Sequence, residues 1–377
     1  MKFTLEQTDG RARAGVLVTD RGAIPTPVFM PVGTQGTVKA VEQRELEHLG
    51  ARIILGNAYH LYLRPGTALI EQAGGLHRFI GWPGSLLTDS GGYQVFSLSD
   101  LRRIGEEGVQ FKSHLDGSTH VFTPERVIDI ERSLGSDIIM VLDECVPYPT
   151  DEAYASASSA LTLRWAERSR ERMERTKPLY GTDQALFAIV QGSVFEQIRE
   201  GASRHLGAMD FDGFAIGGLS VGEPADQMHR ITELCTSILP EGRPRYLMGV
   251  GTPENIVESI ARGVDMFDCV LPTRNGRNAV FFTRSGKLNM RNAYHAADFR
   301  PVDSGCPCYG CRSFTRAYIR HLFKAGEILA LQLASMHNLT FYLQLVTEAR
   351  KAIIDRRFDA WKETILKTLS AEEADES

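Results

Sequence analysis

The sequence has few cysteines and tryptophans and no long apolar run. Its 377 residues include six cysteines and three tryptophans, and six cysteines are too few for a disulfide framework in a chain of this length. The longest apolar runs, such as Ile138–Leu142, are strand-sized, far below the roughly 20 residues of a membrane-spanning helix. The N-terminal MKFTLEQTDGRARAG lacks the apolar core of a signal peptide. We therefore expect a soluble, cytoplasmic protein that does not engage a membrane.

The sequence also lacks internal repeats, low-complexity tracts and a glycine-rich phosphate-binding turn after its first strand-like run. It has instead eight short apolar runs, whose continuity is typical of parallel strands buried on both faces. The intervening helical patterns favour an α/β fold, a TIM (β/α)8 barrel, over an open doubly wound sheet. The predicted strands are Val28–Pro31, Ile53–Leu55, Leu86–Thr88, Ile138–Leu142, Leu186–Val190, Gly213–Ile216, Tyr246–Met248 and Met266–Phe267.

Several of the predicted helices have well-marked ends. Thr123 and Thr252 are each followed by proline, which places a hydroxyl at the N-cap and proline at the first helical position. Gly135 and Gly263 directly follow the last helical residue, where glycine commonly ends a helix. The predicted helices are Pro65–Ala73, Pro124–Leu134, Glu152–Arg175, Phe195–Met209, Pro224–Leu239 and Pro253–Arg262.

We expect three parts along the chain. Residues 1–275 would form the barrel that carries the chemistry, and residues 276–340 a small, basic, zinc-binding subdomain. Residues 341–377 would form a helical segment that completes the barrel surface. The acidic tail Ala371–Ser377, made of small and charged residues, is expected to fray.

Charge is unevenly distributed over the chain. Leu271–Lys324 holds ten Lys or Arg residues against two Asp, a net charge of +8, which leaves −13 for the remainder of a chain whose total is −5. A basic field on an acidic body suits a polyanion bound at one place, with an ordinary solvated face as the alternative.

Polar residues follow the predicted strands at the end where barrel enzymes place their chemistry. They are Asn57, Asp89, Asp143, Glu144, Gln191, Asp268 and several glycines. A single aspartate after a strand is often only a helix cap, but several at one rim indicate an active site. Two carboxylates at one centre suit displacement at an anomeric carbon, one as nucleophile and one moving a proton. Tyr93 and Met248 can sandwich a flat ring, with core packing as the alternative.

Three cysteines lie close together as Cys306, Cys308 and Cys311, with proline and glycine tightening the turn. This spacing predicts a tetrahedral zinc site, one ion per chain, that needs a fourth ligand. His295, His321 and His337 are the nearby histidines, and we favour His337 because it follows an apparent turn before another helix. With four protein ligands the zinc would be structural.

The motifs together resemble those of the tRNA-guanine transglycosylase family, over nearly the whole chain. The resemblance rests on DSGGYQVFS from Asp89, DEC from Asp143, VQG from Val190, GGLSVGE from Gly217, MFDCVLPTRNGRN from Met266 and the cysteine cluster. It implies a pentosyltransferase that exchanges the wobble guanine of tRNAs for Asp, Asn, His and Tyr with 7-aminomethyl-7-deazaguanine, in queuosine biosynthesis. The exchange would pass through a covalent enzyme–RNA intermediate.

The resemblance also implies roles for individual residues. Asp268 matches the nucleophile and Asp89 the general acid/base. Asp143, Gln191, Gly218 and Leu219 match residues that bind the base, on which Tyr93 and Met248 stack, while Cys145 and Val221 resemble the bacterial form. Arg274 and Arg277 would hold the nucleotides of the anticodon loop that flank the target. Bacterial members pair as homodimers, so we expect one here.

Two other classes of protein compete with this interpretation. A retaining glycoside hydrolase shares the barrel and the carboxylate pair, but it would favour a tryptophan-rich groove and leave the basic stretch unexplained. A non-catalytic RNA-binding relative, or accessory subunit, would lack the nucleophile motif, and this chain retains both Asp89 and Asp268.

Overall fold

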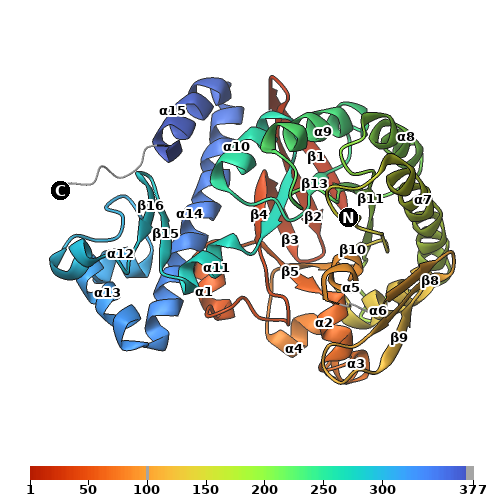
Figure 1. Cartoon of the computed structure of the whole chain (residues 1–377), viewed down its shortest axis with the longest axis horizontal. Helices are drawn as coiled ribbons and strands as arrows, with labels where there is room; N and C mark the ends of the chain where they lie inside the picture. Colours follow the sequence, from red (N-terminus) through yellow and green to blue (C-terminus); the bar gives the residue numbers. More distant parts are fainter. Residues whose placement is uncertain (99–101, 371–377) are drawn as a thin grey trace.

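Eight parallel strands form the centre of the computed structural model, which describes residues 1–98 and 102–370 (Figure 1). They are hydrogen-bonded in the order β4-β14-β13-β12-β11-β10-β6-β5, and a parallel bridge between Val32 and Leu55 joins the first strand to the last. The TIM barrel and all eight predicted strands are thus confirmed. Their bounds are β4 Val28–Pro31, β5 Ile53–Asn57, β6 Ser85–Asp89, β10 Ile138–Met140, β11 Ala185–Val190, β12 Gly213–Ile216, β13 Arg245–Leu247 and β14 Met266–Cys269.

The strands are buried along almost their whole length, as their apolar sequences require. Every residue of β5, β6, β11 and β12 is buried, because side chains fill the barrel on one face and meet the outer helices on the other. Within this wall, polar side chains are confined largely to the strand ends. The fold therefore leaves one rim of the barrel for chemistry.

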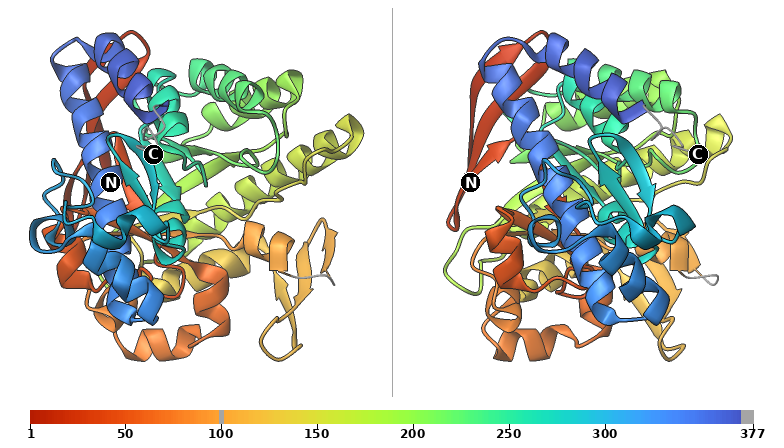
Figure 2. Two further views of the ribbon diagram at one scale, coloured as in Figure 1. Left: turned by 60° about the vertical axis from the view of Figure 1, so that its left-hand side comes forward. Right: turned by 90° about the vertical axis from the view of Figure 1, so that its left-hand side faces the viewer.

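Helices surround the barrel (Figures 1 and 2), and the predicted ones agree with the structure to within two residues at each end. The side-chain oxygens of Thr123 and Thr252 accept hydrogen bonds from backbone N–H groups, and Gly135 ends its helix in the left-handed conformation, which confirms these predicted caps. The bounds are α1 Gln43–His48, α2 Ala58–Leu63, α3 Thr67–Gln72, α4 Leu76–Ile80, α5 Gly92–Leu98, α6 Pro124–Leu134, α7 Glu152–Arg175, α8 Glu196–Gly207, α9 Ala225–Ile238 and α10 Pro253–Ala261.

Two three-stranded antiparallel sheets outside the barrel were not predicted. The first, of β1 (Lys2–Asp9), β2 (Ala12–Thr19) and β3 (Gly22–Thr26), lies over the N-terminal ends of the barrel strands. There Arg13 pairs with Asp265, just before β14, at 3.0 Å. The second consists of β7 (Arg102–Gly105), β8 (Gly108–Lys112) and β9 (Thr119–Phe122) and projects from the body in Figure 2.

A smaller lobe follows the last barrel strand (Figure 1). It contains α11 (Leu271–Arg277), the β15 (Val280–Thr283) and β16 (Gly286–Asn289) hairpin, the short η1 (Ala293–Ala297), α12 (Tyr309–Ser313) and α13 (Arg316–Ala325). Its buried residues, among them Phe281, Ile319 and the three clustered cysteines, form a hydrophobic cluster separate from the barrel core.

Two C-terminal helices tie the lobe to the barrel. α14 (Ile328–Ile354) packs on α11, α12 and α13 and also on β1, β2 and β4, and α15 (Phe358–Ser370) packs on α10 and α14. α14 runs unbroken across residue 340, so the three-part division stays a prediction. The tail expected to fray, Ala371–Ser377, lies outside the described residues. No helix in the described ranges combines the length and apolarity that crossing a membrane requires.

Candidate active site and metal cluster

The carboxyl ends of the barrel strands surround a cavity of about 490 Å³. We call its lining the barrel mouth. Because the strands are parallel, residues that directly follow different strands meet at this one rim. The structure brings to it the following predicted site residues: Asp89, Tyr93, Asp143, Cys145, Gln191, Gly218, Leu219, Met248, Asp268 and Arg274.

Asp89 is the last residue of β6 and is held by three donors. Its Oδ2 accepts hydrogen bonds from the side chains of Asn57 and Gln94, the latter at 2.8 Å, and its Oδ1 accepts from the Ala58 N–H at 3.1 Å. Burial nevertheless raises its pKa to about 7, and the charge of Asp268 adds to the rise. Near neutral pH this carboxyl can therefore both give and take a proton.

Asp268 lies in β14 and is held on one side only. Its Oδ1 accepts from the Tyr246 hydroxyl at 2.6 Å and from the Gly249 N–H at 2.8 Å, whereas Oδ2 has no hydrogen bond to the described residues. Burial raises the pKa of Asp268, and both donors oppose the rise because they favour the carboxylate. A carboxylate fixed by one oxygen, with the other free, is suited to nucleophilic attack.

Asp143 and Gln191 form a buried pair across the same cavity. The Gln191 amide donates to Asp143 Oδ2 at 2.7 Å, and the Ser90 hydroxyl donates to Oδ1 at 3.3 Å. Burial raises the pKa of Asp143 to about 6, while Gln191 Oε1 has no partner among the described residues. Together the pair offers both acceptors and donors to a flat polar ligand.

Glycine is required beside this pair. A Cβ atom on Gly92 would lie 2.5 Å from the Asp143 backbone oxygen, and one on Gly218 would overlap Gln191 Oε1. Gly218 also has φ +64°, a conformation that side chains disfavour. The glycine pairs seen in the sequence thus let the backbone approach the cavity closely.

The remaining predicted residues of the mouth come from four segments. Tyr93 on α5 is 51% exposed, and Met248 after β13 is half-buried. Cys145 after β10 and Leu219 after β12 are both buried. A large aromatic face and a thioether at one open cavity can pack on a planar ring.

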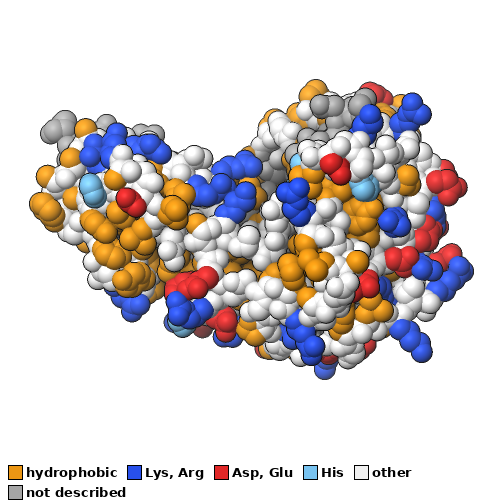
Figure 3. All heavy atoms as spheres, turned by 90° about the horizontal axis from the view of Figure 1, so that it is seen from below, with side chains coloured by type: hydrophobic (Ala, Val, Ile, Leu, Met, Phe, Trp, Pro, Cys, Tyr) orange, Lys and Arg blue, Asp and Glu red, His pale blue; other side chains and the backbone are white. Residues whose placement is uncertain are grey.

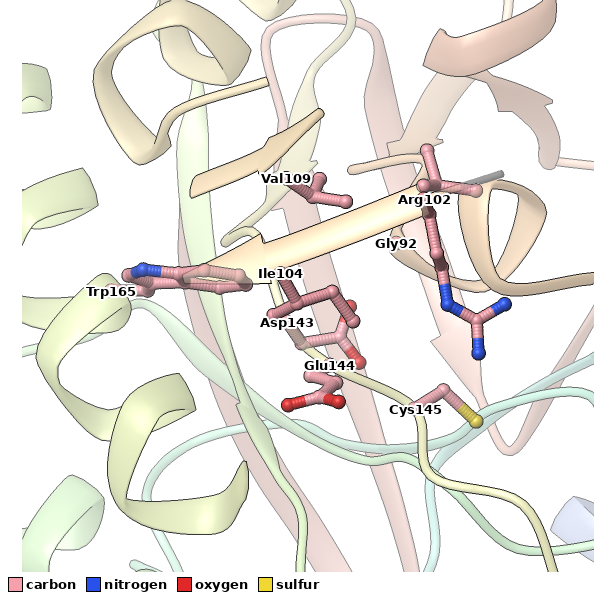
Figure 4. A pocket seen from close by; sticks show the side chains of 9 residues that line it. Gly92, Arg102, Ile104, Val109, Asp143, Glu144, Cys145 and Trp165 are labelled. Carbon is pink, nitrogen blue, oxygen red and sulfur yellow. The ribbon is translucent and has the colours of Figure 1, made fainter. Parts of the chain in front are cut away.

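A small hollow lies beside the mouth and shares Gly92, Asp143 and Cys145 with it (Figure 4). Arg102 and Trp165 line its other walls. Glu144, which the sequence placed only at a strand end, accepts a hydrogen bond of 2.5 Å from the Tyr154 hydroxyl on α7, and its N–H donates to Thr162. Glu144 therefore anchors the Asp143 segment to α7 rather than facing the main cavity.

The two predicted RNA-binding arginines are placed differently. Arg274 on α11 is exposed and lines the cavity. Arg277, one turn further, is half-buried, and its Nε donates to the Thr273 carbonyl at 3.1 Å; it does not line the cavity. Figure 3 shows Lys and Arg side chains gathered on the smaller lobe and along the indentation between it and the barrel.

The smaller lobe contains a second polar group, which we call the metal cluster: Cys306, Cys308, Cys311 and His337. All four are buried, and their ligand atoms lie within 4.8 Å of one another. His337 Nε2 lies 2.8 Å from the Phe282 carbonyl oxygen, so that Nε2–H donates and Nδ1 faces the sulfurs, 3.2 Å from Cys311 Sγ. Three sulfurs and one nitrogen so arranged can hold a metal ion.

The structure selects among the three candidate histidines. His321 is exposed on α13 and His295 is buried in η1, and neither joins the cluster. The reason given for His337 was wrong, however: it lies inside the long helix α14 rather than at a turn. Packing of α14 on the lobe brings its side chain to the cysteines.

Tyr246 and Gln94, which orient the two carboxylates of the mouth, were not identified from the sequence. Tyr246 was counted as a strand residue, and Gln94 was quoted only as part of a motif. A hydroxyl in an otherwise apolar buried strand was the available signal, because a buried tyrosine needs a partner for its hydroxyl.

Comparison with known proteins shows similarity over nearly the whole chain. Residues 8–371 match the family described as queuine tRNA-ribosyltransferase. Proteins of that name are similar to this chain: one from Thermoanaerobacter sp. is 56% identical over 369 residues, 97% of each chain. One from Desulforamulus reducens is 53% identical over 371 residues, 98% of this chain and 99% of its own. One from Symbiobacterium thermophilum is 55% identical over 97% of this chain and 90% of its own.

Proposed function

This chain belongs to the queuine tRNA-ribosyltransferase family, and from that premise we propose how its residues perform the reaction. It is a tRNA-guanine transglycosylase, a pentosyltransferase of queuosine biosynthesis. The proposed substrates are the wobble guanine of tRNAs for Asp, Asn, His and Tyr, and 7-aminomethyl-7-deazaguanine, which replaces it. The observation that carries the mechanism is that Asp89 and Asp268 line one cavity together with the Asp143–Gln191 pair.

In the first half-reaction, Asp268 attacks C1′ of the target ribose. The new bond joins its free carboxylate oxygen to C1′, and the C1′–N bond breaks with its electron pair leaving on guanine. Asp89, whose pKa is about 7, gives its proton to the departing ring nitrogen. The product is an RNA–enzyme ester and free guanine.

The second half-reaction runs in the opposite direction with a different base. Asp89, now ionised, takes the proton from the ring nitrogen of 7-aminomethyl-7-deazaguanine, and that nitrogen attacks C1′. The ester bond breaks, and its electron pair returns to the Asp268 carboxylate. Hydrogen bonds from Tyr246 and Gly249 to Oδ1 stabilise the charge that reappears there.

The base would be recognised by its polar edge. Asp143 accepts from the ring N–H and the exocyclic amine, while Gln191 and the Gly218 N–H donate to the carbonyl oxygen. Adenine presents the opposite pattern and would leave buried groups unpaired, which is costly. The Leu219 carbonyl would receive the aminomethyl group. Tyr93 and Met248 would stack on the ring, and Cys145 with Val221 favours the prequeuosine base.

The RNA would reach the cavity with its target nucleotide turned out of the stack. Arg274 and Arg277 would hold the flanking nucleotides of the anticodon loop, and the basic stretch Leu271–Lys324 would contact phosphates. We propose that this surface acts in a cytoplasmic homodimer.

The metal cluster fits zinc, one ion per chain. Three buried cysteines and one oriented histidine supply the donor set that zinc prefers, and four protein ligands leave no open position. Zinc bound there would be structural and would hold the Cys306–Cys308 segment, α12 and the β15–β16 hairpin on α14. No step of the exchange passes through it.

Exchange of labelled guanine into unmodified tRNA tests the function. Wild-type protein should incorporate label, and added 7-aminomethyl-7-deazaguanine should displace it. Binding of tRNA without incorporation would favour a non-catalytic RNA-binding relative. Hydrolysis of glycosides without incorporation would favour a retaining glycoside hydrolase.

A further inference from the structure

Arg199 is a fully buried arginine behind the wall of the barrel mouth. It lies on α8 and is 0% exposed. Its guanidinium donates to four backbone carbonyls: Ser193 at 2.7 Å, Val190 at 2.7 Å, Gly217 at 2.8 Å and Gly218 at 3.5 Å. It thus joins the end of β11 to the end of β12.

No carboxylate of the described residues forms an ion pair with Arg199. The buried Arg13, in contrast, pairs with Asp265 at 3.0 Å. The carboxylate of Glu223, whose charge acts on Arg199, is hydrogen-bonded to the N–H groups of Ser220 and Val221 instead. A buried, unpaired charge is costly for a fold. Joining two strand ends does not by itself require a charged group, so the charge calls for another explanation.

The four carbonyls belong to the segments that meet the base. The Gly217 carbonyl and the Gly218 N–H are part of one peptide unit, so a cation hydrogen-bonded to this oxygen draws electron density from the nitrogen and strengthens the N–H as a donor. The Val190 carbonyl belongs to the peptide unit before Gln191, so the hydrogen bond to it fixes the backbone that carries the Gln191 side chain. Arg199 therefore strengthens one proposed donor, the Gly218 N–H, and positions the other, the Gln191 side-chain amide, without touching the base.

The chemistry of the exchange gives this charge a use. When the C1′–N bond breaks, its electron pair leaves on the base, and the negative charge spreads to the carbonyl oxygen. Donors fixed in advance toward such an oxygen lower the barrier, because they bind the transition state more strongly than the ground state. A buried cation directly behind those donors adds to this effect in a medium of low dielectric constant.

We propose that Arg199 is a positioning residue for the transglycosylation. It holds Gln191 and the Gly218 N–H in place and supplies the positive potential that stabilises a departing base of the lactam type, a ring carbonyl next to a ring N–H. This inference rests on the function proposed above and deepens it.

Arg132 provides a matched control. It is also a buried arginine that donates to backbone carbonyls, those of Met173 and Thr176 at 3.0 and 3.1 Å, and it does not line the cavity. The test measures single-turnover formation of the covalent adduct for wild type, R199Q, R199K and R132Q. Each variant is assayed at a temperature below its own unfolding transition.

We expect R199Q to form adduct about 100-fold more slowly, a loss typical of removing one oxyanion-stabilising group, with RNA affinity nearly unchanged. R199K keeps the charge but not the planar fork, so it should retain more of the rate than R199Q does. R132Q should react like wild type. Loss of RNA affinity with an unchanged rate of adduct formation would overturn the proposal.

The leaving base separates electrostatics from structural support. A stem-loop RNA with 8-azaguanine at the target position has a more acidic ring nitrogen and needs less stabilisation. The deficits of R199Q and R199K should therefore shrink with this RNA. Equal deficits for both RNAs, or an equal loss in R132Q, would leave Arg199 a purely structural residue. If R199Q does not fold, the rate deficits of R199K with the guanine and 8-azaguanine RNAs decide between electrostatic and structural roles. Absence of exchange in the wild type would reject the proposed function instead.

Discussion

The barrel mouth and the metal cluster both gather polar side chains from distant parts of the chain, yet they are built in opposite ways. In the mouth, hydrogen-bond donors hold the carboxylates of Asp89 and Asp268, and both carboxylates border an open cavity. In the metal cluster, three sulfurs and the His337 nitrogen face one another and are buried on all sides. The first arrangement can receive a molecule, whereas the second can only enclose an ion.

The two regions also differ in what burial does to them. Burial raises the pKa values of Asp89 and Asp143 to about 7 and about 6, so the mouth holds carboxyls that are costly to ionise in the free protein. The metal cluster gains stability from whatever ion it binds, because the binding free energy adds to the free energy of folding. Changes in the mouth should therefore alter the reaction, and changes in the cluster should alter folding.

Asp268→Asn gives the largest expected effect and tests the first half of this comparison. The amide cannot form the ester, so exchange should fall by about 10⁴-fold or more, while RNA binding and the unfolding temperature stay close to wild type. Adduct on denaturing gels and labelled guanine incorporation measure the loss. A persistent covalent adduct in this variant would reject the nucleophile assignment.

Removal of the metal tests the expectation that changes in the metal cluster alter folding. Metal analysis should find about one zinc per chain, and Cys308→Ser should lose it. We expect several kcal/mol of lost stability, which lowers the unfolding temperature by roughly 10 °C at 2–4 °C per kcal/mol. Cys235→Ser, which changes a buried cysteine outside the cluster, is the control. Full zinc content and unchanged unfolding in Cys308→Ser would show that the cluster holds no metal.

The sequence predicted the barrel and the residues of the mouth for one physical reason. Parallel strands buried on both faces have continuous apolar sequences, so the first polar residue after each strand, such as Asp89 or Gln191, marks the same rim. Close spacing likewise predicted the three cysteines. These signals are local in the sequence. Once the topology of the fold is known, they show which residues lie close together in space.

The rest depended on contacts that no local signal carries. The β1–β3 sheet was missed because its strands pack over the barrel end rather than within it. His337 was chosen for a turn that does not exist, since it is α14 packing on the lobe that brings it to the cysteines. Tyr246 and Arg199 were not identified, because their partners are a carboxylate and backbone carbonyls brought close only by the folded barrel.

The pH dependence of the mouth gives a smaller, graded effect. The acid form of Asp89 protonates the departing base, so adduct formation should fall about tenfold per pH unit above its pKa of about 7. Toward low pH the rate should fall again as Asp268 is protonated. Single-turnover adduct formation between pH 5 and 9 measures both limbs.

The same group affects stability with a defined sign. Burial raises the folded-state pKa of Asp89 above its ordinary value of 3.8, so the folded protein binds more protons than the unfolded chain between pH 4 and 7. This contribution to stability therefore falls as pH rises through that window. Asp89→Asn should remove that part of the slope. An unchanged slope of unfolding temperature against pH would contradict the raised pKa.

The smallest expected effect concerns Arg274, which borders the mouth but is exposed. If it contacts a phosphate, Arg274→Gln should weaken RNA binding only a few-fold and reduce the salt dependence of the affinity by about one unit of slope. Arg170→Gln on α7, a half-buried arginine paired with Glu174 and absent from the cavity, is the control and should leave the slope unchanged. If the salt dependence of the affinity is the same for wild type and Arg274→Gln, this arginine contacts a base or does not contact the RNA. A lower rate of adduct formation at saturating RNA would instead show that Arg274 takes part in the chemical step. An exposed charge that only attracts RNA changes the affinity and does not change the rate of reaction in the RNA–enzyme complex.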